Sequence, residues 1–178
     1  MDTQEPYIPD GPLRPEAPQE GAPLILLVDD DMELRTAMRD YLALAGYRVL
    51  EARNAYDGLF LAAQHGTAIQ LLITEINLLP VGGIKLAENI LRLFPQIQVL
   101  CVSECDETRP LRYWMKYLNA SFLRKPFNSE ELEERVHGLL AWDWETVGAP
   151  GPDLGNTHGP LPGHSSNSGD PMFWLKEF

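Results

Sequence analysis

The chain has 178 residues, of which 44% are apolar, so it is long enough to bury one sizeable hydrophobic core. It carries 14 Lys and Arg against 26 Asp and Glu, a net charge of −12, and no segment clusters the basic side chains that a nucleic-acid surface needs. The acidic start resembles no secretory signal, no apolar run is long enough to span a bilayer, and two cysteines fit reduced thiols, so we expect a cytoplasmic protein.

The two ends of the chain differ in composition from its middle. Residues 1–23 are rich in proline and acids and poor in apolar residues, which predicts a disordered tail. Residues 145–178 are rich in Gly, Pro and Ser and predict a flexible tail that contains the aromatic segment MFWLKEF. That segment either docks on the domain, binds a partner as a tethered peptide or has no role, and the sequence leaves these three readings open. Residues 24–144 form the expected domain.

Between the tails, short apolar runs alternate with longer amphipathic ones. This alternation is typical of βα units that build a parallel sheet. The apolar runs predict five strands, at residues 24–28, 47–52, 69–74, 97–102 and 121–123. Helical spacing, Asn caps and Gly stops predict five helices, at about residues 32–45, 54–65, 84–93, 108–118 and 128–141. The sequence therefore predicts an α/β fold with a five-stranded parallel sheet.

Polar side chains follow four of these strands, at the point where each strand ends. Asp29 and Asp30 follow the first strand, Glu75 follows the third, Ser103 the fourth and Lys125 the fifth. In an open α/β sheet the functional site lies at the carboxyl ends of the strands, so we expect these five side chains to surround one small pocket. Three acids beside one lysine are electrostatically unfavourable without a further cation, which favours a metal ion or a protonated carboxyl there.

In this order the motifs resemble the receiver domain of two-component response regulators. The resemblance covers residues 24–142 and rests on VDDD after the first strand, on Glu75 followed eight residues later by Gly83, on the hydroxyl residue Ser103, and on KPF at 125–127. It implies a flavodoxin-like (βα)5 receiver fold with strand order 2-1-3-4-5. It also implies a phosphoryl switch, in which an acceptor carboxylate attacks the phosphohistidine of a sensor kinase.

The resemblance assigns a role to each motif residue. By position, Asp29 and Asp30 would hold Mg²⁺ together with Glu75 and the backbone carbonyl of Asn77, and oxygen ligands of this kind suit Mg²⁺. Ser103 would hydrogen-bond the phosphoryl group, and Lys125 would pair with its charge. Phe122 takes the place of the aromatic residue that turns inward when the switch closes.

The chain departs from the family pattern at two positions. The phosphoacceptor position holds Glu75 instead of aspartate, and the extra methylene moves the carboxylate by more than an ångström towards Ser103 and Lys125. A misplacement of ~1 Å costs phosphoryl transfer on the order of a hundredfold in rate, whereas a permanent carboxylate partly mimics a phosphoryl group of charge roughly −1.5 to −2. In the loop that follows, Leu79 stands where the family has proline, and Pro80 comes one residue later.

We therefore expect a stand-alone, atypical receiver of two-component phosphorelay signalling that is not an enzyme. Its expected partner is a sensor histidine kinase or a downstream signalling protein, with no nucleic acid and no membrane. The family implies an output face of fourth helix, fifth strand and fifth helix, which is also the expected place of a homodimer contact. Two alternatives stay open: a conventional response regulator in which Glu75 accepts phosphate, and a Mg²⁺-dependent phosphatase or phosphotransferase with Asp29 as nucleophile and Asp31 as acid/base.

Overall fold

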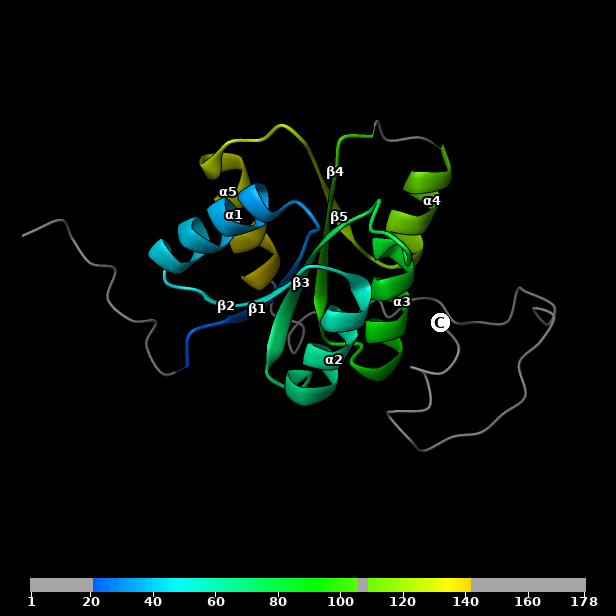
Figure 1. The fold of residues 1–178 in the computed structure, drawn as a ribbon, viewed down its shortest axis with the longest axis horizontal. Helices are drawn as coiled ribbons and strands as arrows, with labels where there is room; N and C mark the ends of the chain where they lie inside the picture. Colours follow the sequence, from blue (N-terminus) through cyan, green and yellow to red (C-terminus); the bar gives the residue numbers. More distant parts are fainter. Residues whose placement is uncertain (1–20, 106–108, 142–178) are drawn as a thin grey trace, which may run out of the picture.

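A computed structural model describes residues 21–105 and 109–141 of the chain. Within them, five strands and five helices alternate as the sequence predicts (Figure 1). In chain order they are β1 (Leu24–Val28), α1 (Met32–Leu44), β2 (Arg48–Ala52), α2 (Ala55–His65), β3 (Ile69–Glu75), α3 (Gly83–Leu93), β4 (Gln98–Ser103), α4 (Arg109–Tyr117), β5 (Ser121–Arg124) and α5 (Ser129–Leu140). Most of the predicted first tail and all of the second, with the MFWLKEF segment, lie outside the described residues.

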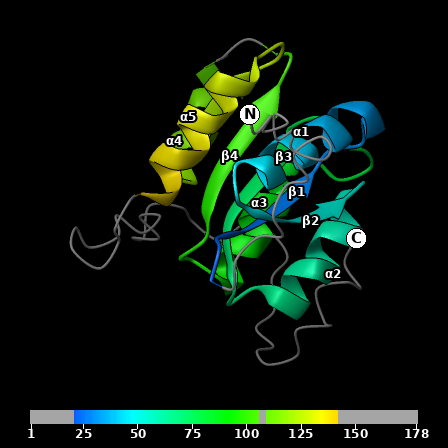
Figure 2. The same cartoon turned by 90° about the vertical axis from the view of Figure 1, so that its left-hand side faces the viewer.

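The strands form one parallel sheet in the order β2-β1-β3-β4-β5, which confirms the predicted topology. Helices α1 and α5 cover one face, and α2, α3 and α4 cover the other (Figure 1). Because both faces are covered, all five residues of β1 are buried, as is typical of a parallel sheet. Figure 2 shows the strands fanning out from β4 to β2 with the usual twist.

Three strands end one residue later than the sequence predicts, and two of the extra residues, Glu75 and Ser103, belong to the motifs. Strand β3 includes Glu75, and β4 includes Ser103, which we expected in a loop. Ser103 pairs with Arg124 of β5, and its carbonyl accepts a hydrogen bond from the backbone N–H of Lys125 at 2.9 Å. The sheet ladder therefore fixes the backbone of both Glu75 and Ser103, which loops would hold less firmly.

The predicted caps are present at the starts of two helices. Asn54 accepts a hydrogen bond from the backbone of α2, and Asn128 forms a capping box with Glu131 at the start of α5. Gly46 follows α1 with a φ of 91°, a conformation that disfavours other residues. These local signals are strong enough in the sequence that the helix boundaries agree with expectation to within about two residues.

Helix α3 begins directly against the end of β3, at Gly83. A Cβ atom at this position would lie 1.9 Å from the carbonyl oxygen of Glu75 and 2.7 Å from Oγ1 of Thr74. The Gly83 N–H also donates to the carbonyl of Ile76 at 2.9 Å. The unusual loop sequence at Leu79 therefore leaves the helix start where the family motif predicts it, because only glycine fits so close to the strand.

We predict that Gly83→Ala destabilises the protein by roughly 2 to 3 kcal/mol, because the added methyl group collides with backbone that cannot move away. The matched control is Gly138→Ala on α5, where an added Cβ meets nothing within 4 Å. The control is expected to gain about 0.5 to 1 kcal/mol, since alanine is the better helix former. Urea unfolding measures both, and equal stability of the two variants would contradict the described contact.

Candidate functional site

Three of the predicted side chains meet at the carboxyl edge of the sheet. The ammonium of Lys125, which follows β5, lies 2.8 Å from Oδ2 of Asp29 and 2.5 Å from Oε2 of Glu75. Asp29 is fully buried at the end of β1, and Glu75 is 6% exposed at the end of β3. A single cation therefore bridges two buried carboxylates from neighbouring strands, as the predicted pocket requires.

The two remaining carboxylate oxygens of this group are also hydrogen-bonded. Oδ1 of Asp29 accepts from the backbone N–H of Asp31 at 2.9 Å, and Oε1 of Glu75 accepts from the backbone N–H of Asn77 at 2.9 Å. All four oxygens of the two buried acids thus have a donor within the chain. Buried carboxylates need such partners, since an unpaired charge in the interior is costly.

Burial and ion pairing act against each other on the pKa values of this group. Burial raises the pKa of Asp29 above its ordinary value, and the bonds from Lys125 and the Asp31 N–H offset this only in part. Burial lowers the pKa of Lys125, but the bonds to Asp29 and Glu75 outweigh it and leave that pKa above its ordinary value. The lysine is therefore charged at neutral pH, and the charge on Asp29 reduces stability.

Ser103 joins the site through Asn77. The Ser103 hydroxyl is fully buried and accepts hydrogen bonds from Nδ2 of Asn77 at 3.2 Å and from the backbone N–H of Cys105 at 3.4 Å. Asn77 therefore lies between the hydroxyl and Glu75, although its expected role used only its backbone carbonyl. Nothing in the sequence indicated this side-chain contact, because an amide two residues past a strand fits many loop conformations.

The acids next to the pocket have separate roles. Asp30 is exposed, and Asp31 caps α1 by accepting from two backbone N–H groups of its first turn at 2.9 and 3.1 Å. Sequence reasoning missed Arg35, whose guanidinium donates to the carbonyl of Asp29 at 2.5 Å and pairs with Glu51 at 3.5 Å. Its place one turn after the cap was the available signal, since a long side chain there reaches back to the strand end.

The two cysteines are free thiols, as expected. Cys101 is buried inside β4, where burial, together with the charge of Glu75, raises the pKa of the thiol to about 12. A thiol with such a pKa stays protonated and unreactive at neutral pH. Cys105 is exposed at the start of the loop after β4, and its sulfur lies 3.4 Å from Nδ2 of Asn77.

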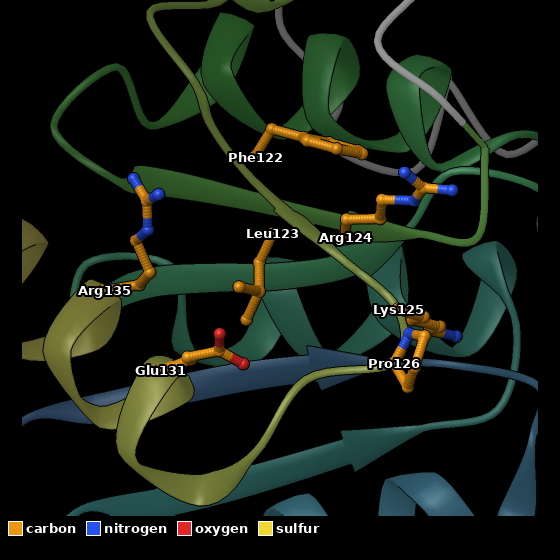
Figure 3. Close-up of a pocket in the computed structure, with 7 residues that line it drawn as sticks. All are labelled: Phe122, Leu123, Arg124, Lys125, Pro126, Glu131 and Arg135. Atoms are coloured by element: carbon orange, nitrogen blue, oxygen red, sulfur yellow. The ribbon is translucent and has the colours of Figure 1, made fainter.

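Phe122 lies beside the site on β5. It is partly buried and packs on the same apolar cluster as Trp114 and Tyr117 of α4. It also lines a pocket of about 650 Å³ between β5 and α5, shown in Figure 3. The pocket is lined by Phe122, Leu123, Arg124, Lys125, Pro126, Glu131 and Arg135. The inward turn of Phe122 that the family implies stays a prediction.

The expected magnesium ligands were Asp29, Asp30, Glu75 and Asn77. Their oxygens are of the type that Mg²⁺ prefers. In the described part of the chain, however, no group of three or more His, Cys, Asp or Glu side chains is placed to hold a metal ion. The Lys125 ammonium already bridges the two buried acids, so a divalent cation at these oxygens would have to displace or share this contact. Metal binding at these residues stays a prediction.

The model of the response regulator receiver domain family matches residues 25–137, more than half of the chain and all of the site residues above. The chain belongs to this family. The receiver fold explains why a lysine after β5 meets acids after β1 and β3, because the family's functional residues gather at this sheet edge. The same comparison confirms the resemblance on which the predicted roles rest, while the role of each single residue remains a prediction.

Two curated relatives share this region. One is a cyclic di-GMP phosphodiesterase from Thermotoga maritima, 28% identical over 116 residues, which cover 65% of this chain and 30% of the relative. The other is the transcriptional regulatory protein CpxR from Klebsiella pneumoniae, 33% identical over 121 residues, which cover 65% of this chain and 48% of the relative. The matched region thus spans less than half of either relative.

Among solved structures, a chain of the CheX–CheY–BeF3–Mg²⁺ complex from Borrelia burgdorferi matches with a TM-score of 0.62 at 18% identity. The match covers 66% of this chain and 88% of that chain, and at this identity it supports the fold alone. In the parts of the chain that the structure describes, no helix has the length and apolar character of a membrane span.

We predict that Asp29→Asn raises the free energy of unfolding near pH 7. The pKa of Asp29 in the folded protein lies above the ordinary value of 3.8, so its charged form costs stability at neutral pH, and this cost disappears as the pH falls below that value. The advantage of the variant should therefore shrink as the pH falls. Urea unfolding at a series of pH values from 7 down to about 4 measures the difference in unfolding free energy between the variant and the wild type. The control is Asp30→Asn, at an exposed position, which we expect to change stability little. A variant less stable than the wild type at pH 7 would contradict the net effect of burial.

Proposed function

We propose that the protein is an atypical receiver of two-component phosphorelay signalling, in which Glu75 replaces the phosphoacceptor aspartate and acts as a partial phosphomimic. The observation that carries this proposal is the buried ion pair between Glu75 and Lys125, with 2.5 Å between Oε2 and Nζ. In the family, this lysine would pair with the charge of the phosphoryl group. Here a permanent carboxylate takes up that pairing.

The geometry of Glu75 also argues against efficient phosphate uptake. One carboxylate oxygen is bonded to the Lys125 ammonium and the other to the Asn77 N–H. An attack on a phosphodonor needs one oxygen free and in line with the leaving group, and a misplacement of ~1 Å costs on the order of a hundredfold in rate. A longer side chain held by two donors is therefore a poor nucleophile in this pocket.

The mimicry is partial for two reasons. A carboxylate carries one negative charge, whereas a phosphorylated residue carries roughly −1.5 to −2. The second reason is that the hydroxyl of Ser103 is hydrogen-bonded to Asn77, whereas in the family it would contact the phosphoryl group itself. The receiver is then biased towards its signalling conformation without being fully locked in it.

In this proposal the protein signals through protein contacts on the face of α4, β5 and α5. That face carries the pocket beside Phe122 and a row of edge-to-face aromatic rings on α4, with Tyr113–Trp114 centroids 6.0 Å apart and Trp114–Tyr117 centroids 5.6 Å apart. Exposed aromatic side chains are common in protein interfaces, and Tyr113 is 54% exposed. A sensor histidine kinase, a downstream signalling protein or a second copy of the chain are the partners we propose, in the cytoplasm.

The phosphatase alternative finds less support in the geometry. Its nucleophile would be Asp29, which is fully buried and hydrogen-bonded at both carboxylate oxygens. Its acid/base would be Asp31, whose carboxylate caps α1. The Asp29 carboxylate is closed off from a substrate, and one oxygen of the Asp31 carboxylate is used by the cap, so we propose a signalling role and no enzymatic activity.

Phosphate uptake tests the proposal directly. We expect Glu75→Asp to take up phosphate from a small acyl phosphate with Mg²⁺ about 100-fold faster than the wild type, because aspartate restores the alignment. Intact mass measures the covalent product, and Glu75→Gln is the control that should show none. A wild type that is phosphorylated as fast as Glu75→Asp would overturn the proposal and favour the conventional response regulator.

We also predict that the wild type depends little on Mg²⁺. Its Tm in about 10 mM Mg²⁺ and in excess EDTA should differ by less than about 1 °C, because Lys125 already compensates the two buried acids. In Lys125→Gln these acids lack their cation, and Mg²⁺ should raise the Tm by about 3 °C or more. The matched control is Lys85→Gln, since Lys85 is an exposed lysine that pairs with Glu88 at 3.0 Å on α3. A clear Mg²⁺ response of the wild type would contradict the compensation.

A further inference from the structure

Four contacts at the carboxyl edge of the sheet close a ring through four residues. Each of the four residues binds the next, and the last binds the first again. The contacts join Glu75 Oε2 to Lys125 Nζ at 2.5 Å, Lys125 N–H to the Ser103 carbonyl at 2.9 Å, Ser103 Oγ to Asn77 Nδ2 at 3.2 Å, and Asn77 N–H to Glu75 Oε1 at 2.9 Å.

Asn77 is the ring member that belongs to a loop. Glu75 and Ser103 are the last residues of β3 and β4, and Lys125 directly follows β5. Asn77 supplies two of the four contacts, one from its backbone and one from its side chain, although the residue is exposed. Asn77 thereby ties the loop after β3 directly to the ends of β3 and β4, and through Glu75 and Ser103 it is linked to Lys125.

We propose that Asn77 is a positioning residue that couples Glu75 to Ser103. In a phosphorylated receiver, the phosphoryl group would connect the acceptor residue to the hydroxyl residue at these two positions. The Asn77 backbone N–H donates a hydrogen bond to the Glu75 carboxylate, and the Asn77 side-chain amide donates one to the Ser103 hydroxyl. The position of the Glu75 carboxylate is thus transmitted to Ser103 without a phosphoryl group.

The ring also contacts the first residues of the loop that leads to α4. A hydroxyl oxygen has two lone pairs, and Ser103 Oγ uses both, one for Asn77 and one for the backbone N–H of Cys105 at 3.4 Å. Cys105 lies in the loop that leads to α4, the helix that carries Tyr113 and Trp114. Holding the Ser103 hydroxyl therefore also holds the first residues of that loop. Hydrogen bonds linked in this way reinforce one another, so the loss of one weakens the others.

A residue that only shapes its own loop would behave differently. Its removal would change signals close to Asn77 and leave Lys125 unaffected, since the ring connects these two residues only through Glu75 and Ser103. The signal of Lys125 is therefore the readout that separates a positioning role from a local structural role.

The experiment compares backbone amide signals by NMR, in the full chain and without any phosphodonor. We expect Asn77→Ala to shift the amide signals of Ser103, Cys105 and Lys125. The matched control is Leu79→Ala in the same loop, where the side chain is 78% exposed, and it should leave these signals in place. Ser103 and Cys105 contact the Asn77 side chain directly, so an unchanged Lys125 signal in Asn77→Ala would overturn the proposal even if the other two signals shift.

A double-mutant cycle gives a second measurement that does not depend on one variant. Ser103→Ala opens the same link from the other side, so the Tm losses of Asn77→Ala and Ser103→Ala should not add, and the double variant should lose clearly less than the sum. Additive losses would contradict the coupling.

The inference rests on the proposed function only in taking Glu75 as a permanent charge. If the wild type takes up phosphate while the NMR signals shift as expected, the proposed function fails and the role of Asn77 stands. If the wild type takes up no phosphate and the Lys125 signal does not shift, the role of Asn77 fails and the proposed function stands.

Discussion

The contact on which the site depends is the ammonium of Lys125 between the carboxylates of Asp29 and Glu75. Two acids this close and this well buried repel each other and lack water, so they need a cation at the point where they meet. The sheet order provides it, because β1 and β3 are neighbours and the residue after β5 reaches across the end of β4. The strand order of the fold therefore places the cation that balances the charges of the two acids.

The resemblance implies an aspartate at the position of Glu75, and glutamate is longer by one methylene. The longer side chain of Glu75 is accommodated because its two oxygens find different donors, the ammonium of Lys125 and the N–H of Asn77. The neighbouring residues keep the types that the family motif has at these positions. These motif residues are sufficient for the family to be recognised, although Glu75 departs from the pattern that the resemblance implies.

The sequence was sufficient to predict the strand order and the meeting of Asp29, Glu75 and Lys125, since apolar periodicity fixes the elements and parallel strands bring their carboxyl ends to one edge. It did not predict the side-chain contact of Asn77 or the reach of Arg35. Both depend on where a loop or a helix lies relative to the sheet, and that is decided by packing across the whole domain. Strand ends were missed for the same reason, because pairing with a neighbour extends a strand beyond its apolar run.

The seam between β3 and α3 limits how the domain can move. At Gly83 the helix backbone lies so close to the carbonyl of Glu75 that not even a methyl group fits between them. A helix seated this tightly has no room to approach the strand any further at its first turn. The first turn of α3 is therefore a closely packed support for the end of β3, next to the acidic pocket.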